Sequence, residues 1–271
     1  MGISYSTARY LAPASFIYNF LTNQYGLAIH DPTMKQVHDS NLSFFSPQPY
    51  FIGGFFFPQQ IIQLIWIYRM WKLNPKKSDA ERKELDQIVD YAPYYALGNF
   101  CIGTWMFFWC NEQLKTSNAF VVVNTLSQLF YIATKLGPMN TQSPSSVLTH
   151  VVSKTFAGIG VLDLLHNTSI AYFKDEAPSM LVKVGTGLGF GLLSASSDWI
   201  FGGCMVYDLV ALAVGQSGSW RQLLSLYAMG SAAIVGAKNY AIPPYESRRE
   251  DYTLTSREDS LTAQEDVNDR V

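Results

Sequence analysis

The sequence predicts an all-α bundle of membrane-spanning helices followed by a short acidic tail. Hydrophobic residues make up 48% of the 271-residue chain, and the charged residues cluster between Arg69 and Asp90 and again after Glu246. The remaining sequence consists of long apolar stretches with tyrosine and tryptophan near their ends, where these side chains anchor helices at the membrane interface. Clustered charge and long apolar runs together are typical of a multi-span membrane protein.

Eight apolar stretches are candidate membrane helices, because a span needs about 20 mostly apolar residues. They cover residues 10–28, 50–70, 94–109, 119–136, 147–172, 180–194, 199–214 and 223–240. Ser197 and Asp198, residue types that favour helix N-caps, separate the sixth stretch from the seventh, and together these two stretches are too long for one crossing. We therefore expect eight spans. Seven is the alternative, because the first stretch is interrupted by Asn19 and Asn23 and the sixth is short.

The orientation follows from the basic residues. They concentrate after the second stretch, at Lys72, Lys76, Lys77, Arg82 and Lys83. Short basic loops face the cytosol, so both termini are expected in the cytosol and residues 31–49 on the opposite side. Asn41 begins an Asn-Leu-Ser sequence in that opposite segment and is a candidate glycosylation site, which would make the chain a glycoprotein. The sequence does not indicate which membrane holds it.

The last residues differ in composition from the rest. Acidic residues outnumber arginine there, and large aliphatic residues are few. Such a segment cannot bury enough apolar area to offset the entropy of ordering it. We expect a transmembrane helical domain at residues 1–243 and a disordered cytosolic tail at residues 244–271.

Two acids fall inside predicted spans. Asp163 lies near the middle of stretch 147–172 and Asp208 near the middle of stretch 199–214. A charge at a helix centre costs about 2.5–3.5 kcal/mol on insertion scales, so such residues are usually functional. His166 follows Asp163 by one turn and shares its helix face. The residues leave open whether these acids form a site or hold helices together through hydrogen bonds.

Other polar and aromatic side chains in the spans have two interpretations each. Gln59, Gln60 and Gln63 follow Pro58 and either line a cavity or join helices. Trp105 and Trp109 share a helix face and either form the wall of an apolar ligand site or anchor the helix. Four glycines alternate with other residues, at Gly185, Gly187, Gly189 and Gly191. A phosphate-binding loop would follow a strand, and none precedes them. They therefore predict close helix packing and are a candidate homo-oligomer contact.

Several function classes are excluded. A net charge of -2 argues against a nucleic-acid partner. The three cysteines and four histidines show no metal-ligand spacing, so no metal site is predicted. Neither a P-loop nor a GxSxG nucleophile elbow occurs. The sequence indicates no cofactor, and its catalytic residues, if it is an enzyme, are unknown.

One part of the chain resembles a known family. The sequence LGNF at residues 97–100 precedes Trp105 and Trp109, and a polar turn and long apolar helices follow. In this order residues 97–172 resemble the TspO-type tryptophan-rich membrane proteins. That family binds tetrapyrroles and sterols in an aromatic-lined bundle of five helices, so the resemblance implies a ligand site near Asn99, Trp105 and Trp109. The whole chain is also similar to multi-span membrane proteins of fungal origin without an assigned chemistry.

Three functions remain open. The first is a lipid-embedded protein that binds or transports a small, mostly apolar molecule in a cavity between the helices at 94–109, 147–172 and 199–214. Its polar contacts would come from Asp163, His166 and Asp208. The second is a membrane enzyme of the isomerase or cyclase type that acts on a lipid or isoprenoid, with a buried aspartate as acid. The third is a structural membrane subunit.

Overall fold

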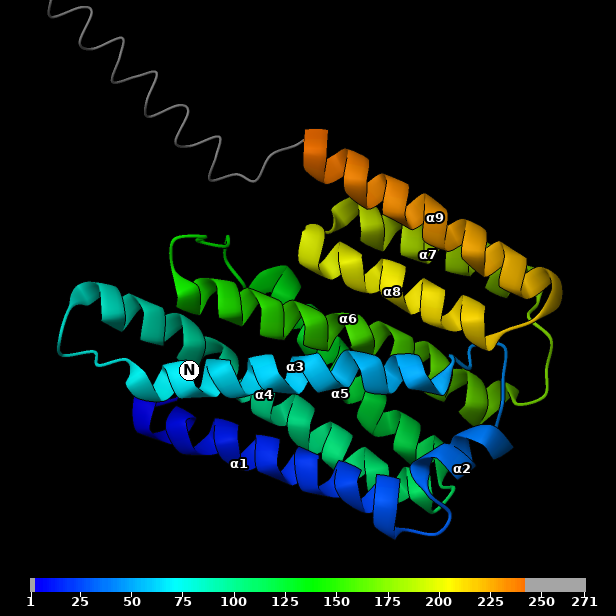
Figure 1. The fold of residues 1–271 in the computed structure, drawn as a ribbon, viewed down its shortest axis with the longest axis horizontal. Coiled ribbons are helices and arrows are strands. Elements are labelled where there is room, and N and C mark those ends of the chain that lie inside the picture. Colours follow the sequence, from blue (N-terminus) through cyan, green and yellow to red (C-terminus); the bar gives the residue numbers. More distant parts are fainter. Residues whose placement is uncertain (1–2, 242–271) are drawn as a thin grey trace, which may run out of the picture.

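The computed structural model describes residues 3–241, and every regular element in this part of the chain is a helix (Figure 1). The all-α prediction is therefore confirmed. The elements are α1 (Tyr5–Gln24), the π-helical turn η1 (Tyr25–Ile29), α2 (Met34–Ser40), α3 (Pro49–Lys72), α4 (Asp79–Cys110), α5 (Leu114–Thr134), α6 (Pro144–Phe173), α7 (Met180–Ser196), α8 (Trp199–Gly215) and α9 (Gly218–Ala241). The tail predicted for residues 244–271 lies outside the described residues.

Each of the eight predicted stretches corresponds to one long helix. The break between the sixth and seventh stretches is confirmed, because α7 ends at Ser196 and α8 begins at Trp199. Asp198 caps α8 by accepting a hydrogen bond from the backbone N–H of Phe201 at 3.0 Å. The same aspartate forms an ion pair with Lys154 of α6. The cap therefore also fixes the start of α8 against a neighbouring helix.

The helix α4, which corresponds to the third predicted stretch, is longer than predicted. It begins at Asp79 rather than at residue 94, so part of the basic segment after α3 is helical and not a loop. Ser78 caps this extension by accepting a hydrogen bond from the backbone N–H of Glu81 at 3.2 Å. Leu85 and Ile88 of the extension are fully buried, one turn apart, as expected for an amphipathic helix on the surface of the bundle.

An ion pair holds this extension to its neighbours. Arg69 of α3 donates to Glu84 at 2.9 Å, and the Ser145 hydroxyl of α6 donates to the same carboxylate oxygen at 2.6 Å. Burial acts to raise the pKa of Glu84, but the hydrogen bonds from Ser145 and Arg69 hold it below its ordinary value. The carboxylate therefore stays charged and joins α3, α4 and α6.

The helix α2 was not predicted. Its seven residues are too few for a hydropathy pattern, but Thr33 and Gln36 form a reciprocal capping box at its start. The Thr33 hydroxyl accepts a hydrogen bond from the Gln36 backbone N–H, and the Thr33 backbone N–H donates to the Gln36 side chain at 2.6 Å. A sequence search for capping boxes would have found this helix.

The long helices form two groups (Figure 1). In the first group α4, α5 and α6 pack in sequence, α1 packs along α4, and α3 packs on α6. Its core includes a cluster of aromatic rings formed by Trp66, Tyr91 and Tyr95. In the second group α9 packs against α7 and α8, and α8 joins this group to α6. The core of the second group includes Met205 and Leu209 together with Phe201 and Trp220.

The connections alternate between the two ends of the bundle. In Figure 1 the α3–α4 and α5–α6 connections lie at one end, and α2 and the α6–α7 and α8–α9 connections lie at the other. The basic segment and α2 are therefore at opposite ends of the molecule.

Candidate binding cavity

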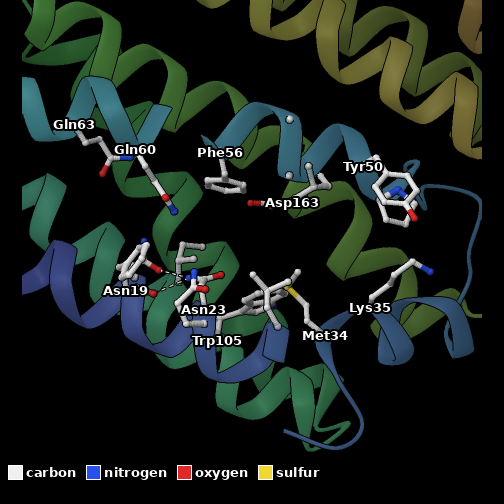
Figure 2. A pocket seen from close by; sticks show the side chains of 18 of the residues that line it. Asn19, Asn23, Met34, Lys35, Tyr50, Phe56, Gln60, Gln63, Trp105 and Asp163 are labelled. Carbon is white, nitrogen blue, oxygen red and sulfur yellow. Dashed lines mark hydrogen bonds between the residues drawn. The ribbon is translucent and has the colours of Figure 1, made fainter. Parts of the chain in front are cut away.

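A cavity of about 390 Å³ lies between α1 and α3. Its floor is formed by α4, α5 and α6, and α2 contributes at one end (Figure 2). Ligand sites for small molecules commonly have volumes of about 300–1,000 Å³. Most of the lining is apolar or aromatic, and it includes Phe16, Phe20, Leu27, Met34, Ile52, Phe56, Ile102, Trp105 and Val121.

The α1 wall carries a chain of amide side chains. Asn23 donates to the Oδ1 of Asn19 at 2.7 Å, and Asn19 donates to the Oδ1 of Asn99 at 2.8 Å. Asn99, fully buried in α4, donates in turn to the carbonyl of Tyr95 at 2.9 Å. These bonds tie α1 to α4 and leave Asn19 and Asn23 on the cavity surface.

The α3 wall carries two glutamines. Gln63 is buried and accepts a hydrogen bond from the Tyr95 hydroxyl at 2.7 Å. Gln60 lines the same wall. The third glutamine of this helix, Gln59, faces α6 and bonds Thr155 at 3.4 Å. Both interpretations of these glutamines therefore apply: Gln60 and Gln63 line a cavity, and Gln59 and Gln63 join α3 to neighbouring helices.

Asp163 of α6 lies at the centre of the site. Figure 2 shows its carboxylate pointing into the cavity beside Phe56, with Trp105 and the two asparagines of α1 across from it. Asp163 is half-buried, and no side chain among residues 3–241 forms a hydrogen bond or ion pair with its carboxylate. It is therefore a polar group that a ligand in the cavity can reach.

The wall beside Asp163 is held in place by a second chain of bonds. The indole Nε1 of Trp105 donates to Asn167 at 2.7 Å, and Asn167 donates to the backbone carbonyl of Asp163 at 2.9 Å. The Trp105 ring also packs against Trp109 with ring centroids 5.1 Å apart. The orientation of Trp105 is thus fixed by contacts outside the cavity.

The helix α2 closes one end of the site. Met34 and Lys35 of α2 line the cavity, and the Trp109 indole donates to the Met34 carbonyl at 3.1 Å. Beneath α2 the rings of His38 and His166 meet edge to face at a centroid distance of 5.0 Å. Burial lowers the pKa of His38 below its ordinary value, with Asp39 acting to raise it and Lys35 to lower it.

The structure separates the predicted site residues. Asp163 and Trp105 line the cavity, while Asn99 lies directly behind Asn19. Trp109 and His166 do not line it and instead contact α2. A cavity was expected between the helices at 94–109, 147–172 and 199–214. The observed cavity borders the first two of these, through Trp105 and Asp163, and its other lining residues come from α1, α2, α3 and α5 rather than from α8.

Asp208 occupies a different environment. It is fully buried in α8, and neither carboxyl oxygen has a hydrogen-bond partner among the residues that the structure describes. The contact between α8 and α6 is close there, since a Cβ added at Gly158 would lie 2.3 Å from the Cβ of Cys204. Asp208 therefore lies in a closed helix interface and not in the cavity.

Sequence reasoning missed the two asparagines of α1. They are four residues apart in an otherwise apolar helix, which places both on one face. That spacing was the signal that α1 contributes a polar wall.

Two other predictions concern residues away from the cavity. Of the four glycines in α7, Gly187 faces Tyr227 of α9, while a Cβ on Gly185, Gly189 or Gly191 would meet nothing within 4 Å. The homo-oligomer contact stays a prediction. Glycosylation of Asn41 also stays a prediction, and in this structure its side chain is buried, donates to Val37 and accepts from Lys174.

Comparison with known proteins adds one finding. A family model described as TSPO-like protein matches residues 9–239. No curated protein and no solved structure matches the chain. The resemblance predicted for residues 97–172 is confirmed, and the match extends through α1 and through α9, so it includes both helix groups.

Proposed function

The chain belongs to the TSPO-like protein family, and on that premise we propose that it is a multi-pass membrane protein that binds a small, mostly apolar molecule between α1 and α3. The cavity of about 390 Å³ carries this proposal. Its lining combines apolar and aromatic side chains with a few polar groups, which is the usual composition of a small-molecule site. Binding is the activity the geometry supports best, and transport would require the site to open.

We propose further that each of the eight long helices crosses the bilayer. By length and hydropathy alone, α3 and α6 are long and apolar enough to span, and α7 and α8 are shorter apolar helices. At 1.5 Å per residue the 17-residue helices α7 and α8 reach roughly 25 Å. That length is close to the roughly 30 Å of the hydrocarbon core. The helices α1, α4, α5 and α9 are long enough but less apolar, and α4 and α5 bury some of their polar side chains inside the bundle, such as Asn99 and Asn124.

The proposed orientation places the basic end of the bundle in the cytosol. The segment after α3 and the start of α4 carry most of the loop lysines and arginines. Alternating connections then put both termini in the cytosol and α2 on the opposite side. The cavity, which α2 borders, lies nearer to that opposite side.

A second candidate is a membrane enzyme that uses Asp163 as a proton donor. The observation that favours it is the carboxyl group of Asp163, which faces the cavity without a partner among residues 3–241. Asp208 is fully buried and does not line the cavity. Host cells that carry Asp163→Asn test this candidate, because loss of one metabolite with unchanged ligand affinity would favour catalysis over binding.

The binding proposal is tested by filling the cavity. Gly53 lines the cavity and Gly189 lies on α7, and a Cβ on either glycine would meet nothing within 4 Å. Gly53→Trp should abolish saturable binding of a naphthalene probe to the protein in nanodiscs, whereas the matched Gly189→Trp should bind like wild type. Equal binding by both variants, or equal loss in both, would contradict the proposed site.

A further inference from the structure

The cavity lining contains one acidic and one basic side chain, and of these two only the basic one has an ionic partner. Asp163 contributes a carboxylate, and the one basic side chain of the lining is Lys35. The Nζ of Lys35 lies 2.5 Å from the carboxylate of Asp39, and both side chains are half exposed at the outer edge of the site. Lys35 is therefore already paired, and Asp163 has no counter-ion among residues 3–241.

The amide side chains Asn19, Asn23 and Gln63 do not donate hydrogen bonds to the Asp163 carboxylate. Asn19 and Asn23 are bonded to each other and to Asn99, and Gln63 is bonded to Tyr95. A carboxylate next to apolar walls is costly unless a cation or several hydrogen bonds compensate it. A positively charged group in the cavity would supply that compensation, while an anion would be repelled.

The rest of the lining favours an organic cation over a metal ion. No group of three or more His, Cys, Asp or Glu side chains in the described part of the chain is placed to hold a metal, and hard cations such as Ca²⁺ need six or more oxygen ligands. Several aromatic rings border the cavity instead, and aromatic faces attract organic ammonium groups when water is excluded: Phe16, Phe20, Tyr50, Phe56 and Trp105.

We propose that the ligand is an organic cation with an apolar body. Its positive head lies against Asp163, and its apolar part contacts the aromatic side chains of α1, α3 and α4. The inference rests on the proposed function, since it requires that the cavity binds a small molecule, and it adds the class of that molecule. It also assigns Asp163 as the residue that selects cations over neutral molecules of the same shape.

The test compares two probes of the same shape. Both carry a naphthalene ring on an alkyl chain. One ends in a trimethylammonium group and the other in a neutral tert-butyl group. Equilibrium binding is measured with the full chain in nanodiscs of zwitterionic lipid, so that the membrane surface does not concentrate the cation. Asp163→Asn is the test variant, and Asp208→Asn is the matched control, because Asp208 is buried outside the cavity.

Wild type and Asp208→Asn should bind the trimethylammonium probe about tenfold or more tightly than the tert-butyl probe. Asp163→Asn should bind the two probes alike, with an unchanged affinity for the tert-butyl probe. If that variant binds neither probe, Asp163→Glu replaces it and should keep the preference for the cation. Equal or weaker binding of the cation by wild type would overturn the inference and leave the proposed function standing. Failure of wild type to bind either probe would overturn both.

Discussion

Each helix group has one aspartate near the middle of an apolar helix, and the two differ in exposure, since Asp163 is half-buried and Asp208 is fully buried. In the group formed by α1 and α3 to α6, Asp163 faces a cavity whose walls are aromatic and amide side chains. In the junction between α6 and the group formed by α7 to α9, Asp208 is fully enclosed. Both acids lie in apolar helices, and the sequence around them did not distinguish their roles.

The spacing of the helices explains the difference. At the α6–α8 junction Gly158 lets the backbones approach until its Cα faces Cys204 directly. Between α1 and α3 the direct contact is small, although Gly53 and Gly54 of α3 line the cavity, because these two helices pack mainly on α4 and α6 behind them. Close packing at Gly158 therefore closes one interface, while α1 and α3, which pack on different helices, leave the other open.

The largest expected effect comes from forcing the closed interface apart. Gly158→Leu places a side chain where Cys204 already lies, and overpacking of this kind costs about 1–3 kcal/mol or more. We expect a markedly lower unfolding temperature in detergent. Gly53→Leu is the matched control at the open interface and should leave that temperature nearly unchanged. Equal unfolding temperatures for Gly158→Leu and Gly53→Leu would show that the two interfaces are packed equally closely.

Removing the enclosed acid should be the next largest effect, and its sign is informative. Neither oxygen of Asp208 has a partner among the described residues, so its burial is a cost. Asp208→Leu should therefore raise the stability of the protein by about 1–3 kcal/mol. Thermal unfolding measures this change. A clear loss of stability would mean instead that Asp208 holds the two helices together.

A smaller effect is expected from the bond that orients the cavity wall. Trp105→Phe keeps an aromatic ring but removes the donor to Asn167, which should cost about 1 kcal/mol in stability and weaken naphthalene binding a few fold. Trp109→Phe removes the bond to Met34 and should loosen α2 with less effect on binding. Titration of both variants with the naphthalene probe compares the cavity wall at Trp105 with the contact that holds α2 at Trp109. A larger loss of affinity in Trp109→Phe than in Trp105→Phe would contradict this assignment.

The smallest effect concerns the pH dependence of α2. Burial lowers the pKa of His38, so the released segment takes up a proton at a higher pH than the packed one. Packing of α2 is therefore fully stable above the ordinary histidine pKa of about 6.5 and weakens as the pH falls below it. The groups that face His38 are His166, Asp39 and Lys35.

Hydrogen exchange of the α2 backbone, corrected for the intrinsic pH dependence of exchange, measures this weakening. Exchange in wild type should speed up modestly between pH 7.5 and pH 5. His38→Gln should show no such change, because it cannot take up the proton. If His38→Gln keeps the full pH dependence of exchange, the pH dependence does not come from His38.

The sequence predicted the helices better than their contacts. The break before α8 was predictable because Asp198 is a good N-cap between two apolar runs. The early start of α4 was not predicted, because the many charged residues around Leu85 and Ile88 mask their apolar spacing and the segment resembles a loop. Hydropathy marked α1 as a weak span, and its asparagines, four residues apart, proved to be a cavity wall.

The candidate site was predictable only in part. Asp163 and Trp105 were found because an acid and paired tryptophans in a span are costly or unusual. The same rule selected Asp208, which has no access to the cavity. Whether an intramembrane acid reaches a cavity depends on the distance between helices, and that distance is set by contacts between residues far apart in the chain.

The most direct test of the central claim maps where an apolar probe binds. A naphthalene probe that carries a diazirine is bound to the full chain in nanodiscs, activated by light, and located by peptide mass spectrometry. The account predicts labels on Phe20 of α1 and Phe56 of α3, which line the cavity, and few on Leu188 and Leu192 of α7, which are apolar and more exposed. Labels spread evenly over α1, α3 and α7, with none displaced by excess unlabelled naphthalene, would contradict it.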